Sequence, residues 1–231
     1  MPEVLADNVV HVLDHGFLAL DAALATDLAV ANGARVSFNQ ASDELTDKDA
    51  GLIRFLMREK HGSPFEHGYF RFIVKAPLFV VREHHRHRAG HSYNEWSGRY
   101  SKLEPEFYVP DFVRTQVGKP GAYSFEPVDE LVREAARREI EENARRSFQA
   151  YERMLEQGVA KEVARAVLPL STYTKYLWSC NPRSLMHFCA LRNHESAQFE
   201  IRQYAAAAES FLERLMPVTH EAFLANGRTA P

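Results

Sequence analysis

Apolar residues in the first part of the chain predict a strand followed by a helix. Val9 to Leu13 is a short apolar run that stops before Gly16, as expected of a strand. Leu20 to Ala34 is rich in alanine, the residue with the highest helix propensity, and therefore predicts a helix. This helix would lead into Arg35 to Phe38.

The next patterns predict a helix, a strand and a second helix. Thr46 is a suitable N-cap for a helix that Gly62 and Pro64 would end. The apolar residues of this helix are three and four positions apart and would form one face, made of Leu52, Ile53, Leu56 and Met57. Tyr69 to Lys75 is aromatic and β-branched, which predicts a strand, and Pro77 suits the start of a helix over Leu78 to Arg88.

Helical patterns dominate the second half of the chain. A proline-containing connection over residues 104–126 precedes them and separates the two halves. Asn181 followed by Pro182 combines an N-cap residue with a proline at the first helical position. The predicted helices cover Pro127–Gln157, Lys161–Val167, Pro182–Arg192 and Ser196–Met216.

Composition places the chain among ordinary globular proteins. It has 231 residues, of which 45% are apolar and 26% charged, and a formal net charge of -3. No apolar run approaches the length of a membrane span, and the N-terminal residues do not have the pattern of a signal peptide. Two cysteines cannot form a disulfide framework. We therefore expect a cytoplasmic protein.

Positive charge is concentrated in one segment, Arg82 to Tyr100. Within these residues lie four histidines and four arginines, namely His84, His85, His87, His91, Arg82, Arg86, Arg88 and Arg99. Like charges repel, so such a concentration in a slightly acidic chain indicates an anion-binding site. A small phosphorylated ligand is the first hypothesis.

Three other interpretations of this segment remain open. His84, His87 and His91 have the spacing that places imidazoles on one helix face, as in a zinc site, although Arg86 and Arg88 would repel a metal ion. The segment could also be a solvated basic helix face. Aromatic residues between the arginines could stack on nucleic-acid bases, but the net acidity of the chain argues against a nucleic-acid surface.

Arg192 and Cys189 lie on one predicted helix and have different expected environments. Arg192 continues an apolar face formed by Leu185, Phe188 and Cys189, so it is either a functional cation or a side chain reaching solvent from a helix end. Cys189 lies among apolar residues, where a thiol is poorly reactive, and is predicted to be a core residue.

Arg86-His87-Arg88 followed by Ser92 to Tyr100 resembles the motif of the flavin-dependent thymidylate synthases. Further blocks in the family's order are Ala34–Phe38, His61–His67, Ala164–Pro169, Asn181–Phe188 and Leu191–Gln198. The resemblance extends over about residues 9–225. Two departures stand out. Eight residues rather than the usual seven separate Arg88 from Ser97, and Glu83 stands where many relatives have glutamine.

The resemblance implies an α+β fold with a mixed sheet and a predominantly helical second half, as a single domain over residues 1–231. It also implies a homotetramer with active sites where subunits meet. Members of the family use FAD, NADPH and methylenetetrahydrofolate to convert dUMP to dTMP. No bound metal and no nucleic-acid or membrane partner is implied.

Site residues follow from the resemblance by motif position. Those expected to hold FAD are Ser63, Arg86, His87, Arg88, Glu95, Asn181, Arg183 and His187. Those expected to bind dUMP are Glu83, Arg86, Glu95, Ser97, Gly98, Arg99, Arg165 and Arg192, with Glu83 the doubtful member because a carboxylate repels phosphate.

Arg192 matches the family arginine that stabilises the ionised imide of the uracil ring, a catalytic role. A fixed cation there favours the ring anion and increases electron density at the carbon that is methylated. Two other functions remain possible, a catalytically inert flavin or nucleotide binder and a metal-dependent hydrolase that uses the histidines.

Overall fold

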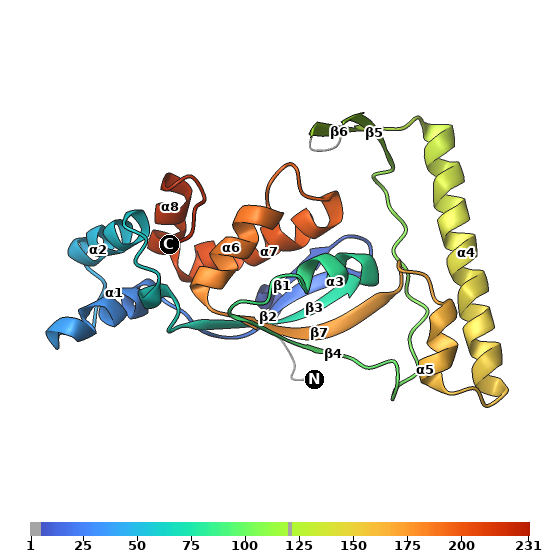
Figure 1. Cartoon of the computed structure of the whole chain (residues 1–231), viewed down its shortest axis with the longest axis horizontal. Coiled ribbons are helices and arrows are strands. Elements are labelled where there is room, and N and C mark those ends of the chain that lie inside the picture. The colour runs from blue at the N-terminus through green and yellow to red at the C-terminus, as the bar shows by residue number, and fades with distance from the viewer. Residues whose placement is uncertain (1–5, 120–121) are drawn as a thin grey trace.

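The computed structural model describes residues 6–119 and 122–231, and a five-stranded antiparallel sheet lies at its centre (Figure 1). In spatial order the strands are β1 (Val9–Val12), β2 (Gly16–Leu24), β3 (Tyr69–Pro77), β7 (Tyr173–Cys180) and β4 (His91–Glu95). All four pairings are antiparallel, so the mixed sheet expected from the sequence is wrong. The expected combination of helices and strands is confirmed.

The second strand replaces the first part of the expected helix over Leu20 to Ala34. β2 pairs with β1 on one side and β3 on the other, and this pairing outweighs the helix propensity of its alanines. Helix α1 (Asp27–Arg35) begins only after Thr26, whose side chain accepts a hydrogen bond from the backbone of Ala29.

Helices α3 (Leu78–His84), α6 (Pro182–Arg192) and α7 (Phe199–Leu215) cover one face of the sheet (Figure 1). Phe72 of β3 packs against both Trp178 of β7 and Phe211 of α7 in this layer. The opposite face of the sheet carries polar and partly exposed side chains, including the Arg71–Asp21 ion pair and Leu177.

A group of helices closes one end of the sheet. It consists of α1, α2 (Asp47–Arg58) and α8 (Pro217–Ala225), and the predicted Thr46 cap of α2 is confirmed. Asp27 is buried and accepts hydrogen bonds from the backbone of Val218 and Thr219, which fixes the start of α8 against α1.

A long helix, α4 (Glu130–Glu156), lies along the other end of the molecule with the short α5 (Lys161–Ala164) (Figure 1). Its buried residues are only Ala144, Phe148 and Tyr151. The predicted loop over residues 104–126 contains a separate hairpin of β5 (Arg114–Lys119) and β6 (Ala122–Pro127), while residues 120 and 121 lie outside the described ranges.

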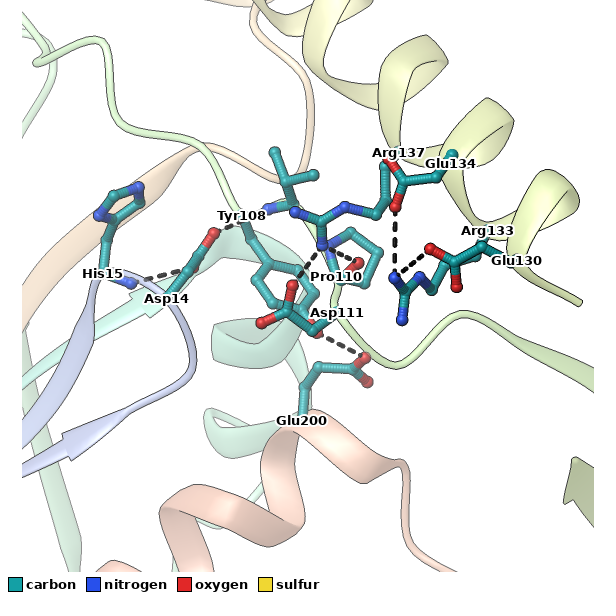
Figure 2. Close-up of polar contacts among 11 residues, drawn as sticks. Asp14, His15, Tyr108, Pro110, Asp111, Glu130, Arg133, Glu134, Arg137 and Glu200 are labelled. Atoms are coloured by element: carbon teal, nitrogen blue, oxygen red, sulfur yellow. Dashed lines mark hydrogen bonds and ion pairs between the residues drawn. The ribbon is translucent and has the colours of Figure 1, made fainter. Parts of the chain in front are cut away.

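The extended segment before this hairpin joins α4 to the rest of the fold. Arg137 of α4 donates hydrogen bonds to the Pro110 carbonyl at 2.7 Å and to Asp111 at 2.5 Å, and Tyr108 reaches Glu200 of α7 (Figure 2). None of the helices in the described ranges has the length and apolar composition required to cross a bilayer.

Candidate active site

The basic segment forms a turn between α3 and β4, and this turn carries Arg86, His87 and Arg88. The helix predicted over Leu78 to Arg88 ends at His84, because the backbone turns there before pairing with β7 as β4. His84, His87 and His91 therefore do not share a helix face. Within the described ranges, no group of three or more metal-ligating side chains comes together.

Side chains from neighbouring elements hold the turn in place. The hydroxyl of Tyr93 donates to the carbonyls of His87 at 2.9 Å and His84 at 3.2 Å. The hydroxyl of Ser184, in the first turn of α6, donates to the Ala89 carbonyl at 2.9 Å. Gly90 adopts a φ of 72°, and a Cβ at this position would collide with the Ser184 hydroxyl.

Burial keeps the histidines around this turn uncharged at neutral pH. His84 packs between Trp178 and Phe188 and shares a 2.6 Å hydrogen bond with Tyr176, and burial lowers its pKa well below the usual range. Burial, followed by repulsion from neighbouring histidines, lowers the pKa of His91 to about 4.

His91 is further held by a hydrogen bond that the Trp178 indole donates to its Nδ1 at 3.0 Å. For His87, burial and then the Arg192 charge lower the pKa to about 4. The permanent charges of the segment are therefore its arginines.

Arg192 lies at the C-terminal end of α6 and reaches this turn within the same chain. Its Nη1 is 2.9 Å from Oε2 of Glu83, its Nη2 donates to the Glu83 carbonyl at 3.3 Å, and its Nε donates to His87 Nε2 at 3.0 Å. The side chain is only 20% exposed. The side chain therefore contacts the turn rather than reaching into bulk solvent, and its role as a functional cation stays a prediction.

The start of α6 contributes a second group of predicted residues. Asn181 caps the helix by accepting from the backbone of Ser184 at 2.8 Å, as predicted. Arg183 lies against Gly62, where a Cβ would come within 2.7 Å of its Nε, and pairs with Glu66 at 2.5 Å. Ser63 follows Gly62 directly, so it lies near the same end of α6.

His187 completes the group one turn later on α6. Burial and then the Arg183 charge lower its pKa, and repulsion from its protonated form contributes to the lowered pKa of His87 and His91. The residues predicted to hold FAD, except Glu95, thus gather around the turn and the first half of α6.

Four of the eight residues predicted to bind the nucleotide line a separate cavity of about 200 Å³. Among its lining residues are Glu95, Ser97, Gly98 and Arg165. Glu95 accepts a hydrogen bond from Thr174 at 2.8 Å. Arg99 lies outside this cavity, paired with Glu162 at 3.1 Å on the surface.

The two groups lie at opposite ends of β4 in one protomer. His91 at the start of this strand belongs to the group around the turn, and Glu95 at its end belongs to the cavity. Four residues of extended chain span about 13 Å. We refer to these two groups of side chains as the turn half-site and the cavity half-site.

Several residues with evident structural roles at the site were not among the predicted ones. Tyr93 and Ser184 fasten the turn, and Thr174 orients Glu95. His91 and Tyr93 are two residues apart, which places them on one face of a strand, and this spacing is the sequence signal for Tyr93. The signal can be interpreted only once β4 is known to pair with β7. Cys189 is fully buried and burial raises its pKa, so the prediction of a core thiol is confirmed.

Comparisons with known proteins identify the family of the chain. The family model described as thymidylate synthase complementing protein matches residues 20–218. A flavin-dependent thymidylate synthase of Streptomyces coelicolor is 48% identical over 221 residues, covering 90% of each chain, and one of Thermotoga neapolitana is 46% identical over 214 residues, covering 92% of this chain and 93% of the relative.

Similarity extends to solved structures. The UMP/dUMP methylase PolB of Streptomyces cacaoi, bound with 5-Br dUMP, superposes with a TM-score of 0.88 at 42% identity. The superposition covers 96% of this chain and all of that one. Sequence, fold and the arginine-lined turn thus agree, and the chain belongs to the flavin-dependent thymidylate synthase family.

Proposed function

We propose that this chain catalyses the reductive methylation of dUMP to dTMP, with methylenetetrahydrofolate as the carbon donor and NADPH-reduced FAD as the hydride source. The observation that carries the proposal is the position of Arg192. Its guanidinium is largely buried and lies against the turn that bears Arg86, His87 and Arg88. The helical spacing on which a metal-dependent hydrolase would depend is absent from this turn.

The turn half-site suits the pyrophosphate of FAD. Arg86 and Arg88 are exposed, and within the described ranges neither pairs with a carboxylate. Such guanidinium groups can form paired hydrogen bonds with phosphate oxygens. In this proposal FAD is held by Ser63, Arg86, His87, Arg88, Asn181, Arg183 and His187, with Glu95 contributed from a cavity half-site. When bound and reduced, the flavin supplies the hydride.

The cavity half-site suits the nucleotide. Ser97, the backbone at Gly98 and the Arg165 guanidinium offer hydrogen-bond donors suited to a phosphate, and Glu95 offers an acceptor. Arg99 lies beside the cavity and would need to leave Glu162 in order to contribute. Glu83, Arg86 and Arg192 would complete the nucleotide site from a turn half-site.

Arg192 would stabilise the uracil ring as its imide anion. A permanent cation in a partly buried position interacts strongly with a developing negative charge, because little water screens it. The ring anion carries increased electron density at the carbon to be methylated. No cysteine nucleophile is needed, in agreement with the burial of Cys180 and Cys189.

We further propose that the protein is a homotetramer in which each active site combines half-sites of different subunits. Three observations support this assembly: the half-sites of one chain are separated, no described helix covers one face of the sheet, and α4 buries few of its residues. Arg192 and Arg165 would then act in one site from two chains. The buried free thiols also suit a reducing compartment, the cytoplasm.

Arg192→Ala tests the function directly. In the FAD-loaded protein we expect dUMP-dependent NADPH oxidation and dTMP formation to fall by about a hundredfold or more, as for loss of other preorganised charges. The flavin absorbance should be retained, since the residues proposed to hold FAD are unchanged. Arg54→Ala, which removes an exposed arginine paired with Glu221, serves as the control. Full dTMP formation by Arg192→Ala would contradict the proposal.

A further inference from the structure

Glu83 contacts the Arg192 guanidinium through two atoms, and its carboxylate neutralises the Arg192 charge. Its carboxylate Oε2 lies 2.9 Å from Nη1 and its backbone carbonyl lies 3.3 Å from Nη2. The Glu83 side chain is 25% exposed and the Arg192 side chain 20%. The charge proposed to stabilise a uracil anion is therefore already balanced by a carboxylate of the same chain.

Three charged groups act on Glu83. Arg192 of α6 and Arg86 of the turn favour its ionised form, whereas Glu200 of α7 disfavours it. His87 is neutral at pH 7 because its pKa is about 4. Arg114 of β5 is paired with Glu200 and not with Glu83. Burial is the largest of all the influences, and it raises the pKa of Glu83 above its usual value in spite of the two arginines.

Glu200 keeps its negative charge next to this pair. Burial opposes the ionisation of Glu200, but hydrogen bonds from Arg114 and Gln198 outweigh it, so its pKa is lowered. Arg114 donates to both carboxylate oxygens, at 3.0 and 2.9 Å. Tyr108 also donates a hydrogen bond to Glu200 (Figure 2). Its fixed negative charge makes Glu83 the carboxylate that gains a proton more easily.

An anionic uracil ring beside Arg192 would place two anions, the ring and Glu83, against one guanidinium. Two like charges that share a site do not both remain ionised when one of them can take up a proton. The ring is also the source of that proton, because its imide N–H must lose one to form the anion.

We propose that Glu83 is the general base that accepts the imide proton of the uracil ring. The N3–H bond breaks, its electron pair stays on the ring, and the proton forms an O–H bond with the Glu83 carboxylate. Arg192 then pairs with the ring anion in place of Glu83, so the net charge of the three groups does not change. The inference rests on the proposed function. It also gives a role to the glutamate that stands at position 83 where many relatives have glutamine, since an amide cannot accept this proton.

The test counts protons when 5-bromo-dUMP binds to the FAD-loaded protein at a pH where the free ligand is neutral. Ultraviolet absorbance reports whether the bound ring is an anion, and calorimetry in buffers of different ionisation enthalpy reports protons released. We expect the wild type to bind the anion without releasing a proton, because Glu83 retains it. Retained flavin absorbance shows that each variant is folded.

Glu83→Gln is expected to behave differently, since the proton has no acceptor in the site. Either each bound anion is accompanied by one released proton, so that binding weakens about tenfold per unit decrease in pH, or the bound ring stays neutral. Both outcomes support the proposal. Glu59→Gln makes the same chemical change at an exposed surface position and should match the wild type.

Three results would overturn the inference: a neutral ring bound to the wild type, a proton released by the wild type for each anion formed, or identical spectra and proton counts in Glu83→Gln and wild type. Failure of the wild type to bind 5-bromo-dUMP would refute the proposed function together with the inference. Binding with the wrong proton count would refute the inference alone.

Discussion

The arginine and histidine side chains of the turn half-site respond to burial in different ways. A guanidinium keeps its proton in a protein interior, whereas a buried imidazole tends to lose it. Burial lowers the pKa of both His87 and His91 to about 4. As a neutral ring, His87 can accept the hydrogen bond that Arg192 donates to its Nε2. His87 therefore helps to orient Arg192 without adding charge.

These lowered pKa values predict that acid destabilises the protein. Between the usual histidine pKa of 6.5 and about pH 4, the unfolded chain binds protons that the folded chain does not, so the free energy of unfolding falls as the pH falls. We expect the melting temperature to decrease from about pH 7 to about pH 5. His91→Gln removes one of these groups and should reduce the decrease.

The matched control for this pH series is His11→Gln, which changes an exposed histidine of β1. Its melting temperature should follow the wild-type pH dependence. An identical pH dependence for His91→Gln and wild type would show that His91 does not contribute to the linkage.

Cys189 gives a second prediction at this scale. Burial raises the pKa of its thiol well above the usual value, so a reactive thiolate is not available. Cys189→Ser should retain dTMP formation within about threefold and lose about 1 kcal/mol of stability for the buried hydroxyl. Turnover and the denaturation midpoint measure the two effects. A folded but inactive variant would mean that the thiol takes part in the chemistry.

At the scale of elements, the position of the turn depends on α6 and β4 together. Ser184 fastens it to the start of α6, Tyr93 fastens it to β4, and Gly90 supplies the backbone conformation that lets both contacts form. Within the described ranges the side chains of Arg86 and Arg88 make no such hydrogen bond, so their placement follows from their neighbours.

Gly90→Ala should therefore weaken FAD binding more than its surface position suggests. The added Cβ meets the Ser184 hydroxyl, and a left-handed φ of 72° is unfavourable for alanine. We expect at least about a tenfold increase in the FAD dissociation constant and about 1–3 kcal/mol lower stability. Flavin fluorescence titration and denaturation measure them.

Gly158→Ala is the matched control for the cost of placing alanine at a positive φ. Gly158 also has a positive φ, of 82°, but a Cβ added there would meet no atom within 4 Å. This variant should lose stability and keep FAD binding. Equal FAD affinity in Gly90→Ala and wild type would contradict the role of the turn.

Local signals in the sequence predict elements better than long-range ones. Helix α6 was predicted correctly because Asn181 and Pro182 act on the adjacent turn alone. The sequence does not predict β7, because its pairing with β3 joins segments about a hundred residues apart. It also predicts a helix from Leu20 onwards, where the structure has the second half of β2. Pairing between distant strands leaves no recognisable pattern in a short stretch of sequence.

At the scale of the whole molecule, the candidate site is divided. Which residues take part in the site is a prediction from the motif resemblance, and the structure places Arg192 against the turn. The separation of the turn half-site from the cavity half-site could not be predicted, because it depends on the length of β4 and on the packing at each end.

Mixed assemblies test this division. Arg192→Ala and Arg165→Ala should each be nearly inactive alone. Co-expressed in equal amounts, they should recover about a quarter of the wild-type sites, because one site in four would combine an intact Arg192 with an intact Arg165 of another subunit. Two different affinity tags on the variants allow mixed assemblies to be purified. No recovery in verified mixed assemblies would mean that both arginines serve the same site from one chain.

The unbroken register of β4 has a consequence for how the family can vary in length. His91 to Glu95 pair with β7 without a bulge, so the additional residue between Arg88 and Ser97 is not taken up within the strand. An insertion there would reverse which side chains face the helices. The turn at Ala89 and Gly90 can lengthen without that reversal. In relatives with the shorter spacing, we therefore expect the arginines that match Arg86 and Arg88 to point in a different direction, and the residue that matches Glu95 to keep its position at the end of the strand.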